Sequence, residues 1–150
     1  MTERPAPDDS LPDRLFWSRH ANPWSVRTLV LAYPTLVLAI YRRDRRLLAG
    51  TLAFVVANPL VFRPPESDDA WATRVVLGER TWVERGLRPS VDLLFVACSA
   101  PVYVLTLRAA VRRRPVRTAI GTVLSIVLML VFFERMTRLY DRTKGAGTMA

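Results

Sequence analysis

The stretch Thr118–Phe133, TAIGTVLSIVLMLVFF, holds sixteen residues without a charge, with Arg117 before it and Glu134 after it. As an α-helix it would rise about 24 Å, while the hydrocarbon core of a bilayer is about 30 Å thick. Starting the helix at Pro115 closes most of this deficit, because proline suits the first helical turn. The stretch therefore predicts a membrane-spanning helix over about 115–134.

Three other runs along the chain are similarly apolar. Two short arginine-rich turns connect the four runs in pairs: RRDRR at 42–46 lies between the first and second runs, and RRRPVR at 112–117 lies between the third and fourth. A turn this short joins neighbouring antiparallel helices, so each pair is expected to form a hairpin. The expected spans cover about 24–41, 46–62, 90–111 and 115–134.

The segment between the two hairpins has a different pattern. In AWATRVVLGERTWVERGL, residues 70–87, apolar residues recur at helical spacing and most charges fall on the opposite side. This pattern predicts an amphipathic helix over about 69–87, lying in the membrane interface or packed as a lid over the spans. Its expected apolar side holds Trp71, Val75, Val76, Trp82, Val83 and Leu87.

Together these elements predict an all-α fold, an integral membrane four-helix bundle of two helical hairpins with an interfacial amphipathic helix between them. The four-span membrane domain is expected over 15–140. Residues 1–14 carry prolines and charges with little to bury, which predicts a disordered N-terminal tail. Residues 141–150 are expected to form a flexible C-terminal tail.

Charge and cysteine content narrow the classes of function. The chain carries nine more positive than negative charges, and 21 of its 22 basic residues are arginine. In a soluble protein this excess would suggest a nucleic-acid partner, but here many arginines flank apolar runs, as membrane anchoring requires. We therefore expect the lipid bilayer, and no nucleic acid, as a partner. Cys98 is the only cysteine, which excludes an intramolecular disulfide and cysteine-based metal motifs.

The basic turns set the expected orientation. With four spans, both turns lie on one side of the membrane, and both termini and the central segment lie on the other. The turn side holds nine arginines against Asp44 alone, whereas the other side holds thirteen basic and twelve acidic residues. Basic residues in short loops favour the cytoplasm. We predict a multi-pass protein of the cell membrane, with the turns at 42–46 and 112–117 cytoplasmic and both termini outside.

The stretch before the first span, RHANPWS, has the features of a helix start. Asn22 is a favourable N-cap, Pro23 suits the first helical position, and Trp24 belongs at the headgroup level. His20, the only histidine, lies outside this helix. We expect it to tie the N-terminal segment to the central helix, through Glu79.

Other polar residues near the spans have both a structural and a functional interpretation. Asn58 is expected to hydrogen-bond between helices, because an unpaired amide in the membrane is costly. Asp92 and Glu134, with His20 on the same side, could form an interfacial metal or acid–base site. Ordinary salt bridges with neighbouring arginines are the simpler interpretation of both carboxylates.

Hydroxyl-bearing residues recur at helical spacing in the third and fourth spans. Ser99 and Tyr103 share one face of the third span, and Thr118, Thr122 and Ser125 share one face of the fourth. Such stripes favour close helix packing in lipid, and a polar pathway between the spans is the alternative. The candidate functional or structural polar positions are His20, Asn22, Pro23, Trp24, Asn58, Glu79, Trp82, Asp92, Ser99, Tyr103 and Glu134.

The runs FWSRHANPWSVRT (16–28) and RVVLGERTWVERGLRPS (74–90), together with the spans, carry a resemblance to a known family. The chain resembles small multi-pass membrane proteins, mainly of halophilic archaea, that are known as a domain of unknown function. The resemblance covers most of 15–140, and its most specific part is HANPWS. It implies membrane residence and carries over no catalytic residue.

The sequence contains no glycine-rich phosphate loop, no HExxH, no nucleophile elbow and no CxxC. We therefore expect no catalytic, cofactor-binding or metal-binding residues. The leading interpretation is a binding, scaffolding or accessory subunit, acting as a homo-oligomer or in a larger membrane complex. A small oligomeric transporter or channel is the alternative, and a membrane-embedded enzyme at the interface is the third.

Overall fold

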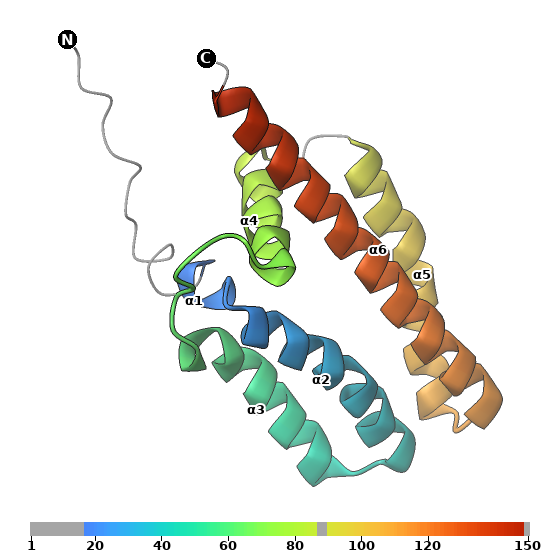
Figure 1. Ribbon diagram of the computed structural model, residues 1–150. Coiled ribbons are helices and arrows are strands. Elements are labelled where there is room, and N and C mark those ends of the chain that lie inside the picture. The colour runs from blue at the N-terminus through green and yellow to red at the C-terminus, as the bar shows by residue number, and fades with distance from the viewer. Residues whose placement is uncertain (1–16, 87–89, 149–150) are drawn as a thin grey trace.

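The computed structural model describes residues 17–86 and 90–148, and this part of the chain forms six helices and no strand (Figure 1). The prediction of an all-α fold is confirmed. The expected N-terminal tail, residues 1–14, lies outside the described residues. The helices are α1 (Ser18–His20), α2 (Pro23–Arg42), α3 (Arg45–Val61), α4 (Trp71–Glu84), α5 (Val91–Val111) and α6 (Pro115–Thr148).

Side-chain caps fix where three of the helices begin. At the start of α2, Oδ1 of Asn22 accepts a hydrogen bond from the backbone nitrogen of Trp24 at 2.9 Å, as expected for an N-cap. Asp44 caps α3 through the nitrogens of the two residues that follow Arg45, both at 3.0 Å. Ser90 caps α5 through the nitrogen of Leu93 at 3.2 Å.

The two arginine-rich turns have the same backbone geometry. Arg43 (φ 57°) and Arg113 (φ 51°) both adopt the left-handed conformation that often ends a helix. The backbone nitrogen of the next residue then donates to a carbonyl of the preceding helix, from Asp44 to Ala39 and from Arg114 to Ala109, both at 3.0 Å. Each turn therefore reverses the chain tightly, as the hairpin prediction requires.

Helices α2, α5 and α6 are long and apolar enough to cross a membrane, judged by length and composition. Helix α3, with 17 residues, rises about 25 Å and is not among the spans found in the described residues. Three of the four expected spans thus meet this criterion, and the second does not.

Helix α6 is longer than the sequence suggested. It continues to Thr148, where we expected a flexible tail from residue 141, and its 34 residues rise about 51 Å. Contacts with the central segment support the extension, since Asp68 accepts hydrogen bonds from Tyr140 at 2.6 Å and Lys144 at 2.5 Å. The hydrogen bond from Lys144, and to a smaller extent that from Tyr140, lowers the pKa of Asp68 to about 2.

Helix α4 lies against the C-terminal half of α6 (Figure 1). The two backbones approach each other closely at Gly78, where an added Cβ would lie 2.0 Å from the carbonyl oxygen of Met136. The buried side of α4 agrees with the expected one in part: Val75 and Val76 are buried as expected, whereas Trp71 and Val83 are exposed. The buried residues are Ala72, Thr73, Val75, Val76 and Gly78, and Leu87 lies outside the described residues.

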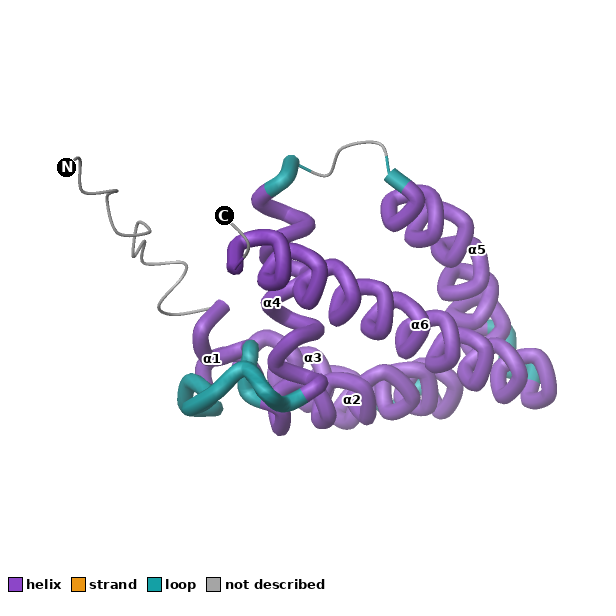
Figure 2. The backbone as a smooth tube through the Cα atoms, turned by 45° about the horizontal axis from the view of Figure 1, so that its top comes forward, coloured by secondary structure: helices purple, strands orange, loops and turns teal. Residues whose placement is uncertain are grey.

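The two hairpins run in the same direction, with both basic turns at one end of the molecule (Figures 1 and 2). Helix α4 and the C-terminal end of α6 lie at the other end. Helices α2 and α5 meet where the rings of Tyr33 and Tyr103 pack edge to face, with centroids 5.7 Å apart. A small apolar cluster joins α4 to the start of α2 through Ala21, Val26 and Val76.

Candidate functional site

A buried polar network links the start of α2 to the end of α3. Its centre is Asn58, whose Oδ1 accepts a hydrogen bond from Oγ of Ser25 and whose Nδ2 donates to Oγ1 of Thr28 at 2.8 Å. Asn58 and Ser25 are both fully buried. The expected hydrogen bonding of Asn58 between helices is therefore present, and its partners are two hydroxyls of α2.

His20 extends this network on the N-terminal side. Its Nδ1 lies 3.1 Å from Oγ of Ser25. Because Ser25 donates its hydroxyl hydrogen to Asn58, the hydroxyl accepts from His20, which places a hydrogen on Nδ1. Burial lowers the pKa of His20, which favours the neutral ring at physiological pH. The structure thus gives His20 a partner five residues along the chain, and the expected contact with Glu79 stays a prediction.

Two further bonds fasten the N-terminal segment to the end of α3. A guanidinium nitrogen of Arg19 donates to the carbonyl of Leu60 at 3.0 Å, and Nδ2 of Asn22 donates to the carbonyl of Arg63 at 2.9 Å. Carbonyls at the end of a helix lack an intrahelical partner, so these side chains satisfy them. Asn22 therefore caps α2 with its oxygen and binds the end of α3 with its nitrogen.

The chemistry available to this network is limited. A serine nucleophile must give its hydrogen to a base, but Ser25 gives its hydrogen to an amide oxygen. Its hydroxyl is also buried, so a substrate has no approach to it. The arrangement of imidazole, hydroxyls and amide acts as interhelical glue, with every polar atom of Asn58 in use.

Trp24, at the start of α2, is largely exposed, and the guanidinium carbon of Arg27 lies 5.2 Å from the centroid of its ring. Pro23 stands at the first position of α2. Both positions fit the geometry expected for a helix that begins at the level of lipid headgroups.

The candidate residues of α4 face different surroundings. Burial raises the pKa of Glu79 to about 7. The ring of Trp82 packs on Phe132 of α6 at 5.7 Å between centroids, and its buried Nε1 has no hydrogen-bond partner in the described chain.

The carboxylates expected near His20 are engaged elsewhere. Asp92 forms a 2.7 Å ion pair with Arg135, which joins the start of α5 to α6. Glu134 pairs with Arg138 one turn along at 3.0 Å and accepts a hydrogen bond from Trp71 at 3.3 Å. Within residues 17–86 and 90–148, no three acidic, histidine or cysteine side chains lie close enough together to hold a metal ion.

The hydroxyl stripes of α5 and α6 serve helix packing. Ser99 donates to the carbonyl of Phe95, within its own helix, at 2.7 Å. Tyr103 donates to the backbone carbonyl of Ser125 in α6 at 3.1 Å, and Oγ of Ser125 lies 3.4 Å from that of Thr106. The stripe pattern was therefore informative about the α5–α6 contact.

Sequence reasoning missed several members of the N-terminal network. Arg19, Ser25 and Thr28 were not among the candidate positions. Their spacing of three residues places Asn22, Ser25 and Thr28 on one side of the helix. The pattern indicates a polar side, but the partner 33 residues away appears only in the folded chain.

Comparison with known proteins identifies a family and nothing closer. No curated protein and no solved structure matches the chain. The family of unknown function DUF6653 matches residues 13–150, which is most of the chain. The chain therefore belongs to the DUF6653 family.

Proposed function

We propose that this chain is an integral membrane protein that crosses the bilayer four times as two hairpins, and that it works by binding, as a scaffolding or accessory subunit. The observation that carries the proposal is the outward apolar surface of its long helices. In the most apolar window of α6, only 11% of the residues are buried within the chain, against 28% in α2 and 22% in α5. Soluble monomers rarely expose so large a continuous apolar surface.

Helix α3 is the least secure of the four proposed spans, and its ends supply the argument for it. At about 25 Å it is shorter than the hydrocarbon core. Arg45 and Arg46 at its start and Arg63 just after its end can extend their charged groups to the headgroups on both sides. Local thinning of the bilayer accommodates the remaining mismatch at a modest cost. Val56, in the middle of α3, is 76% exposed, which suits a lipid-facing position.

The ends of the molecule favour one orientation. Both arginine-rich turns lie together, opposite the end that carries α4 and the end of α6 (Figure 1). Arginines in short loops favour the cytoplasmic side. We therefore propose that both turns are cytoplasmic, and that α4 and both termini are outside the cytoplasm.

Binding is favoured over catalysis because the candidate polar groups already have structural partners. The N-terminal network uses Asn58 and Ser25, and the interfacial carboxylates pair with arginines. The hydroxyls of the α5–α6 contact are directed at backbone carbonyls, which weakens the alternative of a polar pathway between these helices.

A topology experiment tests the membrane proposal. A reporter enzyme that is active only outside the cytoplasm is fused to the C-terminus, and in a matched fusion it follows Asp44 in the first turn. We expect activity from the first fusion and none from the second, with the full chain resistant to alkaline extraction from membranes. Release by alkali, or the reverse pattern of activity, would overturn the proposal.

A second experiment tests the binding role. Chemical crosslinking in native membranes, followed by native mass measurement in detergent, should give a homo-oligomer or a defined larger complex. Flux of a specific solute into liposomes that contain only the purified protein would instead establish the transporter alternative.

A further inference from the structure

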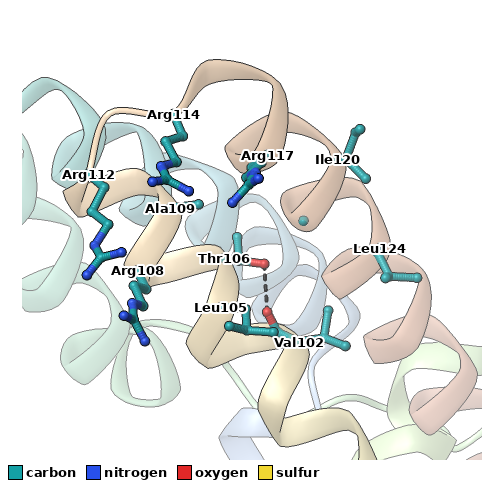
Figure 3. Close-up of a pocket in the computed structure, with 11 residues that line it drawn as sticks. Val102, Leu105, Thr106, Arg108, Ala109, Arg112, Arg114, Arg117, Ile120 and Leu124 are labelled. Carbon is teal, nitrogen blue, oxygen red and sulfur yellow. Dashed lines mark hydrogen bonds between the residues drawn. The ribbon is translucent and has the colours of Figure 1, made fainter.

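The turn between α5 and α6 opens into a cavity of about 530 Å³ on the side of the hairpin (Figure 3). Its turn end is lined by four arginines, two from each side of the hairpin, and no acidic residue lines the cavity. These arginines are Arg108, Arg112, Arg114 and Arg117. In the described chain, none of them makes a side-chain hydrogen bond or an ion pair with the protein.

The remaining lining is graded from charged to apolar along both helices. On α5, Leu105 and Val102 follow Arg108 away from the turn, and on α6, Ile120 and Leu124 follow Arg117 (Figure 3). From Arg117 to Leu124 the groove extends about 10 Å along the helix axis. Ile120 is 63% exposed, so this apolar wall is open to the surroundings of the helix.

Close packing makes the floor of the groove. An added Cβ at Gly121 would lie 2.4 Å from Oγ1 of Thr106, so the two helices touch at this point. Thr106 keeps its own hydroxyl bonded to the carbonyl of Val102 at 2.7 Å. The floor therefore offers shape and apolar contact, and the unpaired polar groups are concentrated at the turn.

We propose that this groove binds one anionic glycerophospholipid, with the phosphate held by the arginines of the turn and the start of an acyl chain along Leu105, Ile120 and Leu124. The inference rests on the proposed function, because it requires the hairpin to stand in a bilayer. Guanidinium groups bind phosphate oxygens in bidentate fashion, and basic pockets between membrane helices bind anionic headgroups. Four unpaired cations without an acid leave charge that such a headgroup would neutralise.

The first arginine-rich turn supplies a built-in comparison. There, Asp44 stands among the arginines and caps α3. One cavity beside Arg46, at the start of α3, includes only this one arginine in its lining. We therefore expect the lipid preference to belong to the second turn, although both turns would lie at the same membrane surface.

The test uses the full chain in lipid nanodiscs that contain phosphatidylglycerol and phosphatidylcholine in equal amounts. Native mass spectrometry after gentle release should find one phosphatidylglycerol retained per chain. The double variant R112Q/R117Q removes one arginine from each helix, and we expect its apparent Kd for phosphatidylglycerol to rise about tenfold or more. The matched variant R42Q/R45Q makes the same charge change at the first turn and should bind as the wild type does.

The outcomes separate this inference from the membrane proposal. Equal loss of lipid in both variants would indicate general charge attraction and would overturn the inference. Displacement of the lipid by millimolar inorganic phosphate would also overturn it, in favour of a free-phosphate site. If the wild type resists alkaline extraction but shows no anionic preference, the lipid inference fails while the membrane proposal stands; extraction by alkali would end both.

Discussion

The two hairpins share a turn geometry but differ in what holds their helices together. Arg43 and Arg113 take the same left-handed conformation. In the first hairpin, α2 and α3 are joined by hydrogen bonds around Asn58, at the end far from the turn. In the second, α5 and α6 touch closely at Gly121 and share the Tyr103 hydrogen bond to α6.

This difference shows two ways of holding the helices of a hairpin in contact. A buried amide gives directed bonds at one place and leaves the rest of the contact loose, whereas a small residue lets backbones approach over a longer stretch. Gly50 and Gly121 illustrate the contrast. An added Cβ at Gly50 in α3 meets nothing within 4 Å, while one at Gly121 in α6 meets Thr106.

Helix α4 contacts both hairpins, so a substitution in α4 should have the largest effect on stability. Gly78→Ala would bring a Cβ to 2.0 Å from the carbonyl oxygen of Met136, a backbone atom that no rotamer change can move. Helices α4 and α6 must then shift apart, so we expect a loss of about 3 kcal/mol, the upper end for overpacking. Thermal unfolding in detergent measures the loss, and the fluorescence of Trp82, which packs on Phe132, reports whether α4 has moved. An unchanged midpoint would show that the contact is looser than described.

The first hairpin should depend most on its buried amide. Asn58→Leu removes both bonds of the side chain and leaves the Ser25 hydroxyl without its acceptor, which we expect to cost about 2 kcal/mol. Thr28 keeps a bond to the carbonyl of Trp24 at 2.7 Å, so it contributes less to the loss.

A double-mutant cycle sharpens this prediction. Ser25→Ala should destabilise the wild type and should cost less in the Asn58→Leu background, because one of its two partners is already absent there and only the bond from His20 remains to be lost. Additive losses in the unfolding midpoints would show that the two side chains do not act together.

The second hairpin should respond to its glycine. Gly121→Ala places a Cβ 2.4 Å from Oγ1 of Thr106, a side-chain atom that can rotate away in part. We therefore expect a loss of about 1 kcal/mol, smaller than at Gly78. Gly50→Ala is the matched control in the first hairpin, and it should be neutral or stabilising by up to about 1 kcal/mol, because alanine favours helix. Equal effects at the two glycines would remove the distinction between the hairpins.

The sequence predicts local features of this fold better than long-range ones. The Asn22 cap and the two short turns follow from residue type and spacing, which act over a few residues. The length of α6 does not, because its last turns are charged and their support comes from Asp68, more than 70 residues earlier. Similarly, the spacing in α4 correctly placed Val75 and Val76 on the buried side, but it did not predict that Trp71 would be exposed or that Gly78 would approach the backbone of Met136.

In the candidate site, too, the sequence predicts local features better than long-range contacts. Asn58 could be singled out because an amide in an apolar run needs a partner, but the identity of that partner depends on how α2 and α3 align. The pairing of His20 with Ser25 was within reach of the sequence, as the two are five residues apart. The unpaired arginines of the second turn were visible as charge, and only the structure shows that they surround one cavity.

Glu79 gives a smaller effect, which depends on pH. Its pKa is raised to about 7 from the ordinary value of 4.5, so the folded chain holds a proton that the unfolded chain has released. Stability should therefore fall as the pH rises from about 4.5 to about 7 and then level off. Since part of the side chain is exposed and solvent screens its charge, we expect a change of only about 1 kcal/mol.

The variant Glu79→Gln isolates this contribution. Glutamine resembles the protonated carboxyl, so the free energy of unfolding of the variant should match that of the wild type near pH 5 and exceed it near pH 8 by about 1 kcal/mol. His20 acts in the opposite direction, because its lowered pKa means that stability is lost as the pH falls below 6.5. That contribution is common to both proteins and cancels in their difference. If the difference did not change with pH, the Glu79 carboxyl would be as well solvated in the folded chain as in the unfolded one.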